Sequence, residues 1–392
     1  MDGARTTTRP RRIGVGRLLP LIIAATLAVD VMARFLPLDS LCFQAWECMT
    51  RYQEPGSSFE ANRQFRSNRT HGNLSNMGNL PSLREYRPQV FTTDANGFRN
   101  APGLASTAPD GIVVGDSFVA GYGISDEETL PVQLSAATGL RFYNAGGPYA
   151  YLQTVRALKT KMGFQRGQVI VVWTESESVA QLQQAEALAQ NGDAKAGFMR
   201  AAFGPQGARI RALLRGWWYT SPAKIVAEKA FLSIADDRIL PNVYRSRVVE
   251  RHLTTGKPIL FYPSDVDGFH SRRDVTEATD FLVALSAGLR QEGLASMVVL
   301  APNKYTVYEP LLSDRQQGPG DAVHPLARLE AALKSRGIQA LDLTPSFAAQ
   351  ARADLPTGEY LYWLDDTHWN RHGIEMAVAA LRRTWFDGSR SQ

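Results

Sequence analysis

Short apolar runs alternate with helix-like segments from Gly111 onwards, and this alternation constrains the fold more than any other feature of the chain. The first runs are Gly111–Gly115, Arg141–Asn144 and Gln168–Trp173, each too short for a helix. Strands linked by helical crossovers pair in parallel, with right-handed connections. The pattern therefore predicts an α/β fold, a three-layer α/β/α sandwich around a parallel sheet.

The alternation stops over residues 178–256 and then resumes. The interrupted region is helical and irregular in pattern, which favours an insertion laid on the sheet. The elements expected after it are strands at Pro258–Tyr262, Ala295–Ala301 and Gln339–Leu343, and helices at Val275–Gly293, Pro325–Ser335 and Arg371–Arg383. They continue the same sheet, and Asn370 is placed to cap the last helix.

The N-terminus combines a basic tail with an apolar segment. Residues 1–17 hold five arginines and one aspartate, and Leu18–Val29 is apolar. Two interpretations fit: a membrane anchor over residues 18–38, or a signal segment cleaved near Ala33. Because positive charge stays on the cytoplasmic side, both put the bulk of the chain outside the cytoplasm, in the periplasm, with the tail inside at the inner membrane.

Charge and cysteine content limit the remaining possibilities. The tail contributes four of the five net positive charges, so the rest of the chain is about neutral and nucleic-acid binding is not expected. The two cysteines, Cys42 and Cys48, could close a local disulfide in an oxidising compartment or remain free thiols. Residues 50–92 are polar and poor in periodic pattern, and residues 39–90 are interpreted as an extracytoplasmic linker before a domain at 91–392.

A candidate nucleophile follows the first strand of the expected sheet. Gly115-Asp-Ser-Phe118 places Ser117 where the strand ends, and ligands of parallel α/β sheets bind beyond the carboxyl ends of their strands. A serine hydroxyl needs a base, and the base needs a group that holds its tautomer. Leu364-Asp-Asp-Thr-His-Trp-Asn370 supplies His368 as the base, with Asp365 and Asp366 both suitably spaced as its partner.

Three further segments follow strand ends and are candidates for binding the reacting group. Tyr143–Gly147 contains Asn144 and Gly146, and the backbone N–H of Gly146 is expected to bind the oxyanion beside that of Ser117. Glu175 and Lys304 follow the third strand and the strand at Ala295–Ala301, where they could approach the cleft. No metal or dissociable cofactor is needed for this chemistry.

These motifs, in this order, resemble the SGNH (GDSL-like) hydrolase superfamily over roughly residues 90–385. Phe91–Arg99 looks like the segment that precedes the serine in bacterial members, and Gly121–Thr129 like the segment that follows it. The resemblance implies a flavodoxin-like sandwich and serine acyl transfer. The chain departs from the superfamily in lacking an asparagine after the third strand, where it reads Trp173-Thr-Glu-Ser-Glu-Ser178.

A narrower likeness is to the alginate O-acetylation proteins and their relatives. Ala301–Tyr308, Leu341–Thr344 and Asp366-Thr-His-Trp369 carry it. The Asp-Thr-His spacing of that group favours Asp366 as the partner of His368, whereas the usual superfamily spacing favours Asp365. In the alginate proteins, however, this segment precedes the serine.

The resemblance implies an extracytoplasmic O-acetyltransferase acting on an exported polysaccharide. An acyl-ester donor, a polysaccharide acceptor and a membrane acyltransferase or export complex are the expected partners. A carbohydrate esterase of the same fold, and a non-catalytic polysaccharide-binding or scaffold protein, remain as alternatives.

Overall fold

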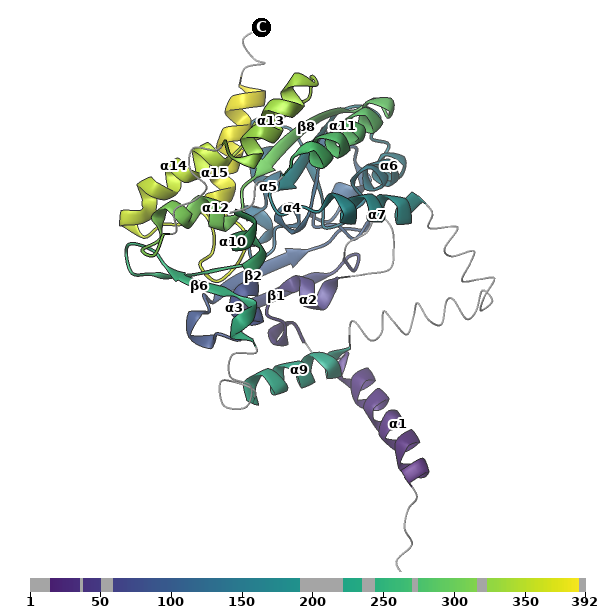
Figure 1. The fold of residues 1–392 in the computed structure, drawn as a ribbon. Helices are drawn as coiled ribbons and strands as arrows, with labels where there is room; N and C mark the ends of the chain where they lie inside the picture. Colours follow the sequence, from purple (N-terminus) through teal and green to yellow (C-terminus); the bar gives the residue numbers. More distant parts are fainter. Residues whose placement is uncertain are drawn as a thin grey trace, which may run out of the picture.

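The structure is a computed structural model that describes residues 15–35, 38–50, 59–190, 221–234, 244–269, 274–315 and 323–387. Its centre is a five-stranded parallel sheet in the order β4-β3-β5-β8-β9. Figure 1 labels one of these strands, β8, beside α11 and α13. In chain order the strands are β3 (Gly111–Gly115), β4 (Phe142–Gly146), β5 (Gln168–Thr174), β8 (Ala295–Ala301) and β9 (Gln339–Asp342). This order is the one found in flavodoxin-like sheets.

Helices cover both faces of the sheet, which explains why its strands are apolar throughout. Successive strand residues point to opposite faces, so Val113 joins one core and its neighbours Ile112 and Val114 join the other. The first core is closed by α5 (Leu130–Thr138), α12 (Lys304–Tyr308), α14 (Thr344–Asp354) and α15 (Arg371–Leu381). The second core is closed by α6 (Tyr151–Met162), α7 (Val179–Gln190), α11 (Thr276–Gln291) and α13 (Pro325–Ser335). The predicted α/β class with a parallel sheet is confirmed.

One predicted strand lies outside this sheet. Residues 258–261 form β7, which pairs antiparallel with β6 (Val249–His252) in a separate two-stranded ribbon. Ile259 and Phe261 are buried in the same core as the sheet residues. An apolar run indicates that a strand is buried but not which strand it pairs with. The sequence pattern therefore could not distinguish pairing within the central sheet from pairing with β6.

The predicted helical insertion at residues 178–256 is only partly described. Helices α7 and α9 (Pro222–Ile234) lie within it, but so does strand β6, so it is not purely helical. Residues 191–220 and 235–243 of the insertion are outside the described part of the chain.

The expected linker at residues 39–90 is a folded segment where it is described. It contains α2 (Ala45–Met49) and α3 (Asn73–Met77), and β1 (Gln64–Thr70) pairs antiparallel with β2 (Arg87–Thr92). Cys42 and Cys48 form the anticipated disulfide. β1 buries few of its side chains, so its composition is polar and resembles that of a loop, and its sequence pattern does not predict a strand.

The N-terminal apolar segment is the helix α1 (Val15–Ala33). No helix among the described residues combines the length and apolarity required to cross a membrane. Asp30 interrupts the apolar character of α1. It is buried against α9, where it accepts hydrogen bonds from the Ser221 hydroxyl and the Ala223 N–H, and it pairs with Arg34 at 3.0 Å.

Short elements complete the described fold. They are α4 (Ser117–Ala120), α10 (Pro263–Phe269), η1 (Leu38–Leu41), η2 (Pro81–Leu83), η3 (Leu104–Ser106), η4 (Asp126–Glu128), η5 (Arg245–Arg247), η6 (Glu309–Leu311), η7 (Leu355–Thr357) and the π-helical segment η8 (Arg382–Phe386).

Candidate active site

Ser117 lies at the carboxyl end of β3, as its position in the sequence predicts. It is the first residue of α4, and Asp116 caps that helix by accepting a hydrogen bond from the N–H of Phe118 at 2.9 Å. The Ser117 side chain is half-buried. The first N–H groups of a helix have no acceptor within the helix, so the backbone of Ser117 brings a donor to the same place as its hydroxyl.

His368 links Ser117 to Asp366 by two short hydrogen bonds. Its Nε2 lies 2.7 Å from the Ser117 Oγ, and its Nδ1 lies 2.6 Å from Asp366 Oδ1. The serine and the histidine are 251 residues apart in the chain. With the proton on Nδ1 held by the carboxylate, Nε2 is free to accept the serine proton, which is the arrangement that general-base catalysis requires.

Aromatic rings fix the position of the imidazole. The rings of Phe118 and Tyr122 lie 5.1 Å and 5.4 Å from that of His368, centroid to centroid. Trp369 packs edge-on against Phe118 at 5.1 Å. This packing restricts rotation of His368 and leaves its Nε2 directed at the serine.

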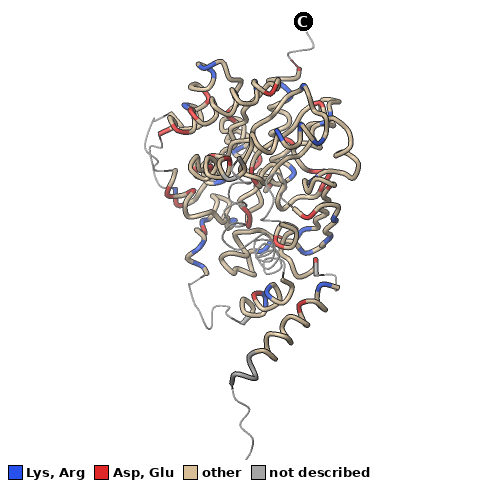
Figure 2. The backbone as a smooth tube through the Cα atoms, turned by 90° about the vertical axis from the view of Figure 1, so that its right-hand side faces the viewer, with Lys and Arg blue, Asp and Glu red and all other residues tan. Residues whose placement is uncertain are grey.

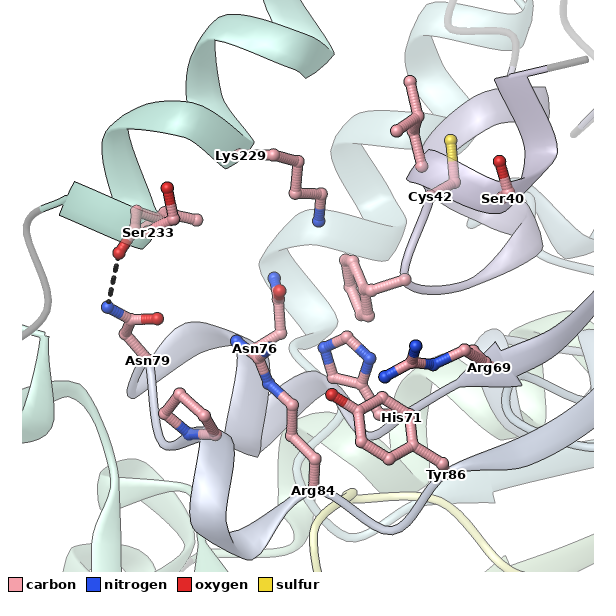
Figure 3. Close-up of a pocket in the computed structure, with 14 residues that line it drawn as sticks. Ser40, Cys42, Arg69, His71, Asn76, Asn79, Arg84, Tyr86, Lys229 and Ser233 are labelled. Carbon is pink, nitrogen blue, oxygen red and sulfur yellow. Dashed lines mark hydrogen bonds between the residues drawn. The ribbon is translucent and has the colours of Figure 1, made fainter.

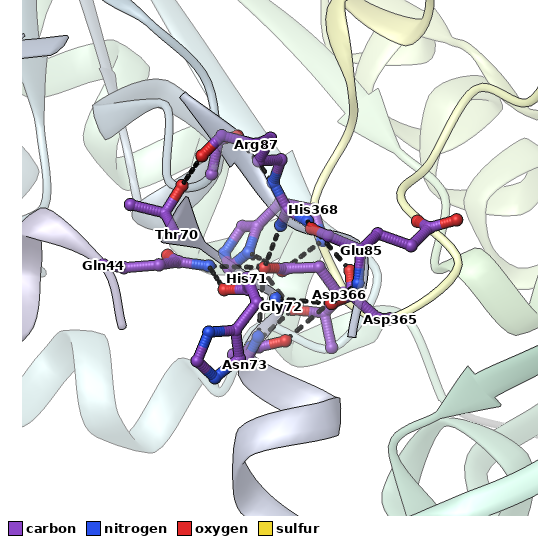
Figure 4. A network of polar contacts seen from close by, with 12 residues as sticks. Gln44, Thr70, His71, Gly72, Asn73, Glu85, Arg87, Asp365, Asp366 and His368 are labelled. Atoms are coloured by element: carbon purple, nitrogen blue, oxygen red, sulfur yellow. Dashed lines mark hydrogen bonds and ion pairs between the residues drawn. The ribbon is translucent and has the colours of Figure 1, made fainter. Parts of the chain in front are cut away.

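The second oxygen of Asp366 accepts three hydrogen bonds from the N-terminal segment. The donors are Gln44 Nε2 at 2.6 Å, the Asn73 N–H at 3.1 Å and Arg87 Nη2 at 3.1 Å (Figure 4). The carboxylate is fully buried. Burial by itself would raise the pKa of Asp366, but His368 and Arg87 outweigh it and lower that pKa well below its usual value. Asp366 is therefore ionised at neutral pH.

Asp365, the alternative partner of the histidine, binds the N-terminal segment instead. Its Oδ2 accepts from the Gly72 N–H at 2.6 Å, the Glu85 N–H at 2.9 Å and the Ser75 hydroxyl at 3.0 Å. Gly72 has no room for a side chain, since a Cβ there would overlap the carbonyl of Asp365. Of the two adjacent aspartates, the structure thus brings Asp366 to His368 and uses Asp365 to attach residues 72–85 to the site.

Arg87 joins the two aspartates and was not among the residues selected from the sequence. Its Nη1 lies 2.9 Å from Asp365 Oδ1, its Nη2 lies 3.1 Å from Asp366 Oδ2, and its side chain is 5% exposed. The guanidinium stacks on Trp363 at 4.1 Å. A buried arginine beside two buried carboxylates balances their charge. No local motif marks Arg87, because its partners are almost 280 residues away.

Lys304 stabilises the loop that contains Asp366 and His368. Its ammonium donates to the carbonyls of Leu260 at 2.7 Å, Leu364 at 2.8 Å and Asp366 at 3.1 Å, which uses all three of its protons. The residue is buried, and burial lowers the pKa of Lys304 to about 7, with Asp365, Glu85 and Asp366 opposing that shift. The expected approach of Lys304 to an open cleft is therefore wrong.

Gly146 and Asn144 are engaged with each other. The N–H of Gly146 donates to the Asn144 side-chain oxygen at 2.9 Å, and Asn144 Nδ2 donates to the carbonyl of Val119 at 2.8 Å. A Cβ at Gly146 would overlap the backbone of Val119 and Ala120. In this structure the Gly146 N–H is not free to bind an oxyanion, contrary to expectation. The glycine is needed because β4 and α4 approach closely.

Glu175 connects the ends of two strands. Its Oε2 accepts from the Asn303 N–H at 2.9 Å and the Thr306 hydroxyl at 2.7 Å, and its Oε1 lies 3.3 Å from His324 Nε2. Burial would raise the pKa of Glu175, but these neighbours, His324 foremost, lower it. Its described contacts are with the β8 side of the sheet edge and do not include Ser117.

Thr174, at the end of β5, lies beside the position where the superfamily asparagine is missing. Its hydroxyl is within reach of two carboxyl groups, Asp116 Oδ2 at 3.2 Å and Glu177 Oε2 at 3.3 Å. A hydroxyl has one proton, so it can donate to only one of them at a time. Burial, together with the charge of Asp116, raises the pKa of Glu177 to about 8.

Replacement of Glu177 by glutamine is expected to flatten the dependence of stability on pH. Because its folded pKa of about 8 lies above the ordinary 4.5, the folded state holds the extra proton and loses stability as pH rises through this window. The slope is at most about 1.4 kcal/mol per pH unit. Urea unfolding at several pH values between 5 and 8 measures it. The exposed Glu359→Gln is the control, and an unchanged slope in Glu177→Gln would contradict the assignment.

The disulfide encloses Gln44, one of the donors to Asp366. Gln44 Nε2 also donates to the carbonyl of His71 at 3.0 Å, and the Cys42–Cys48 bridge closes the turn that presents it. Replacing both cysteines by serine is expected to cost about 2 kcal/mol of stability for a loop of this size. Gln44→Leu leaves the bridge intact and is expected to lower kcat about tenfold, since it removes one donor to a buried carboxylate.

Denaturant unfolding and ester hydrolysis, measured on both variants, separate the two effects. Loss of stability without loss of activity in Gln44→Leu would show that the amide does not support the carboxylate.

Part of the candidate site lies in a segment that matches a known protein family. Residues 253–386 match the model of the SGNH hydrolase-like domain of the acetyltransferase AlgX. No curated protein matches the chain. The anticipated likeness to the SGNH superfamily and to the alginate O-acetylation proteins is thus confirmed over this part of the chain, and it indicates an enzyme.

The AlgX-like match covers one side of the candidate site. His368, Asp365, Asp366 and Lys304 lie within it, whereas Ser117 and the N-terminal segment that holds Asp366 lie outside it. The hydrogen bonds described above join the matched and unmatched parts.

Proposed function

We propose that this protein is a serine O-acyltransferase that acetylates an exported polysaccharide through Ser117, His368 and Asp366. The observation that carries the proposal is the hydrogen-bonded series from the Ser117 Oγ through His368 to the buried Asp366 carboxylate, with separations of 2.7 Å and 2.6 Å. The acetyl group comes from the match to the AlgX acetyltransferase domain, and the polysaccharide acceptor comes from the resemblance to the alginate O-acetylation proteins.

The proposed reaction has two half-reactions. In the first, His368 Nε2 takes the Ser117 proton while Oγ bonds to the carbonyl carbon of the acetyl ester. The tetrahedral intermediate collapses, the donor alkoxide leaves with the proton from His368, and the acetyl group stays on Ser117. In the second, His368 takes the proton of a sugar hydroxyl, whose oxygen attacks the acetyl-serine and releases Ser117 with its proton restored.

Asp366 and the serine backbone have distinct proposed roles. The carboxylate holds the proton on His368 Nδ1 and stabilises the imidazolium that forms in each half-reaction. The N–H of Ser117, at the start of α4, is the proposed oxyanion donor. Gly146 is left out of this role because its N–H is bonded to Asn144.

Hydrolysis of the same acetyl-serine is the second candidate function. The Ser117–His368 pair is only partly buried, which supports access of water as well as of a sugar hydroxyl. We place the activity outside the cytoplasm, because the Cys42–Cys48 disulfide is typical of oxidising compartments. A membrane acyltransferase or export complex is then the proposed source of the acetyl donor.

Incubation of the full chain with a chromogenic acetyl ester, with and without an oligosaccharide acceptor, tests the proposal. Wild-type protein should release the chromophore and carry a trapped acetyl group on Ser117, identified by mass spectrometry. Ser117→Ala should lower the rate at least about 10³-fold, while Ser335→Ala, at an exposed serine, should not. Acetylated acceptor identifies a transferase, and acetate alone an esterase. Equal rates for wild type and Ser117→Ala would overturn the proposal.

A further inference from the structure

A cavity lies between α9 and the N-terminal segment, and Ser117, Asp366 and His368 are not among its lining residues. Its volume is about 460 Å³. Figure 3 shows Lys229 directed into it from α9, facing Arg69, His71 and Tyr86 on the opposite wall. Asn79 closes one end by donating to the carbonyl of Leu232 at 3.0 Å.

The cavity wall is cationic. Arg69, Arg84 and Lys229 line it, and none of the described lining residues is acidic. Lys229 is paired at 3.2 Å with Glu47 beside the cavity. Hydrogen bonding from Arg84, followed by contact with Arg69, lowers the pKa of Tyr86. The guanidinium groups of Arg69 and Arg84 both approach the phenol of Tyr86 and not a carboxylate. Their positive charge therefore favours the binding of an anionic ligand.

Polar groups of His71 and Arg84 line the cavity. His71 is 7% exposed and its ring has the Asn76 side chain as a hydrogen-bonding neighbour, whereas the buried Nε of Arg84 has no hydrogen-bond partner. The imidazole is held between Phe43, at 5.5 Å, and Tyr86, at 5.6 Å. Burial, then the charges of Arg84 and Lys229, lower the pKa of His71 to about 4. A neutral imidazole can donate one hydrogen bond to a ligand oxygen.

The donors in the cavity match the chemistry of a phosphate group. Such a group offers several acceptor oxygens to guanidinium, ammonium and imidazole donors at once. A phosphate oxygen would give an acceptor to the Nε of Arg84, which otherwise lacks a partner despite being buried.

Exposed apolar side chains lie on α9, which lines this cavity, and on α1, which packs against α9. They indicate that the phosphate belongs to a lipid. Leu41 and Leu232 belong to the lining of the cavity. On α9, Val226 is 46% exposed and Phe231 is 52% exposed. Helix α1, which is bound to α9 through Asp30, also presents large exposed apolar side chains: Leu21, Ile22, Ile23, Leu27, Val29, Val31 and Met32. Figure 2 shows little charge along the described length of α1.

We propose that this cavity binds the phosphate headgroup of an anionic phospholipid while the apolar faces of α1 and α9 rest in the lipid surface. Cationic groups beside an apolar helical surface give this kind of interfacial binding. The cavity also adjoins the candidate active site, because the carbonyl of His71 and the carboxylate of Asp366 share the Gln44 amide as donor. Lipid binding of this kind does not depend on the proposed acyl transfer.

Vesicle sedimentation and calorimetry with the full chain test the proposal. Vesicles of phosphatidylcholine, with and without phosphatidylglycerol, measure surface binding. A soluble short-chain phosphatidylglycerol, inorganic phosphate and a uronic acid oligosaccharide are titrated separately. We expect the soluble phosphatidylglycerol to bind more tightly than either other anion. Arg69→Gln/Arg84→Gln should weaken binding to the anionic vesicles about tenfold or more.

Two further variants distinguish lipid binding in the cavity from a general effect of charge and from insertion of the apolar surface. Arg336→Gln/Arg382→Gln removes the same charge from exposed positions near α13 and α15, at the other end of the molecule from α9 (Figure 1), and should bind like wild type. Val226→Ser/Phe231→Ser should weaken vesicle binding and leave the soluble lipid bound.

Three outcomes would overturn the proposal. One is the absence of binding of soluble phosphatidylglycerol to wild type, which needs no variant to interpret. Another is equal vesicle binding by the cavity and control variants. The third is tighter binding of phosphate or the oligosaccharide than of the lipid, which would identify a soluble anion as the ligand.

Discussion

Replacement of Asp366 by asparagine is expected to lower kcat about 10³- to 10⁴-fold without unfolding the protein. The amide oxygen can keep the contacts with Gln44, Asn73 and Arg87, which approach Oδ2. The amide NH₂ then faces His368 Nδ1 and forces the imidazole proton onto Nε2. In that tautomer the histidine cannot accept the proton of Ser117.

The adjacent Asp365→Asn is the matched control for this substitution. Asp365 is equally buried but contacts the N-terminal segment, so its replacement is expected to lower stability and to change kcat by no more than about tenfold. Ester hydrolysis and denaturant unfolding, measured on both variants, give the comparison. A larger loss of kcat in Asp365→Asn than in Asp366→Asn would reverse the assignment of the histidine partner.

Replacement of Arg87 by methionine is expected to cost about 3–5 kcal/mol of folding free energy. Methionine approximates the length of the side chain but leaves the carboxylates of Asp365 and Asp366 without their shared cation. Both carboxylates are almost completely buried, so water cannot replace the guanidinium. Activity should fall as well, because Asp366 loses one of the groups that keep it ionised.

Guanidinium chloride unfolding measures the cost, with Arg156→Met as the control. Arg156 pairs with Glu292 at 2.9 Å near the surface, where a salt bridge contributes about 1 kcal/mol or less. A similar small loss for Arg87→Met would mean that the two aspartates do not depend on the arginine for compensation.

The local sequence pattern was sufficient to predict most strands of the sheet. The strand predicted at Ala295–Ala301 and the helix at Pro325–Ser335 coincide with β8 and α13, because burial of alternate residues and helix caps are local properties. The same reasoning misassigned Pro258–Tyr262, which is apolar but belongs to a separate ribbon. It also missed β1, whose exposed face makes it polar.

The positions of Ser117 and His368 were predictable for a comparable reason. A serine at the carboxyl end of the first strand and a histidine before the last helix are brought to the same edge by the topology of a parallel sheet. Helix α15 begins at Arg371 with Asn370 as its cap, and this leaves His368 in the preceding loop.

The residues that hold Asp366 in place contact it from distant parts of the chain. Gln44, Asn73 and Arg87 reach Asp366 from positions about 280 to 320 residues away, in a segment whose sequence reads as a linker. The sequence pattern predicts the N–H of Gly146 as an oxyanion donor, since no local rule shows that the Asn144 side chain accepts its hydrogen bond.

The sequence by itself determined the parallel α/β sheet and the choice of Ser117 and His368 as the candidate nucleophile and base, since both follow from periodicity and from strand ends. Only the tertiary structure decided that Asp366 rather than Asp365 contacts His368. It also decided that Arg87 balances the charge of both aspartates, and that Lys304 is buried beneath the loop that contains Asp366. Two adjacent aspartates have the same local pattern. Their roles diverge because their carboxylates meet different donors, and those donors come from distant parts of the chain.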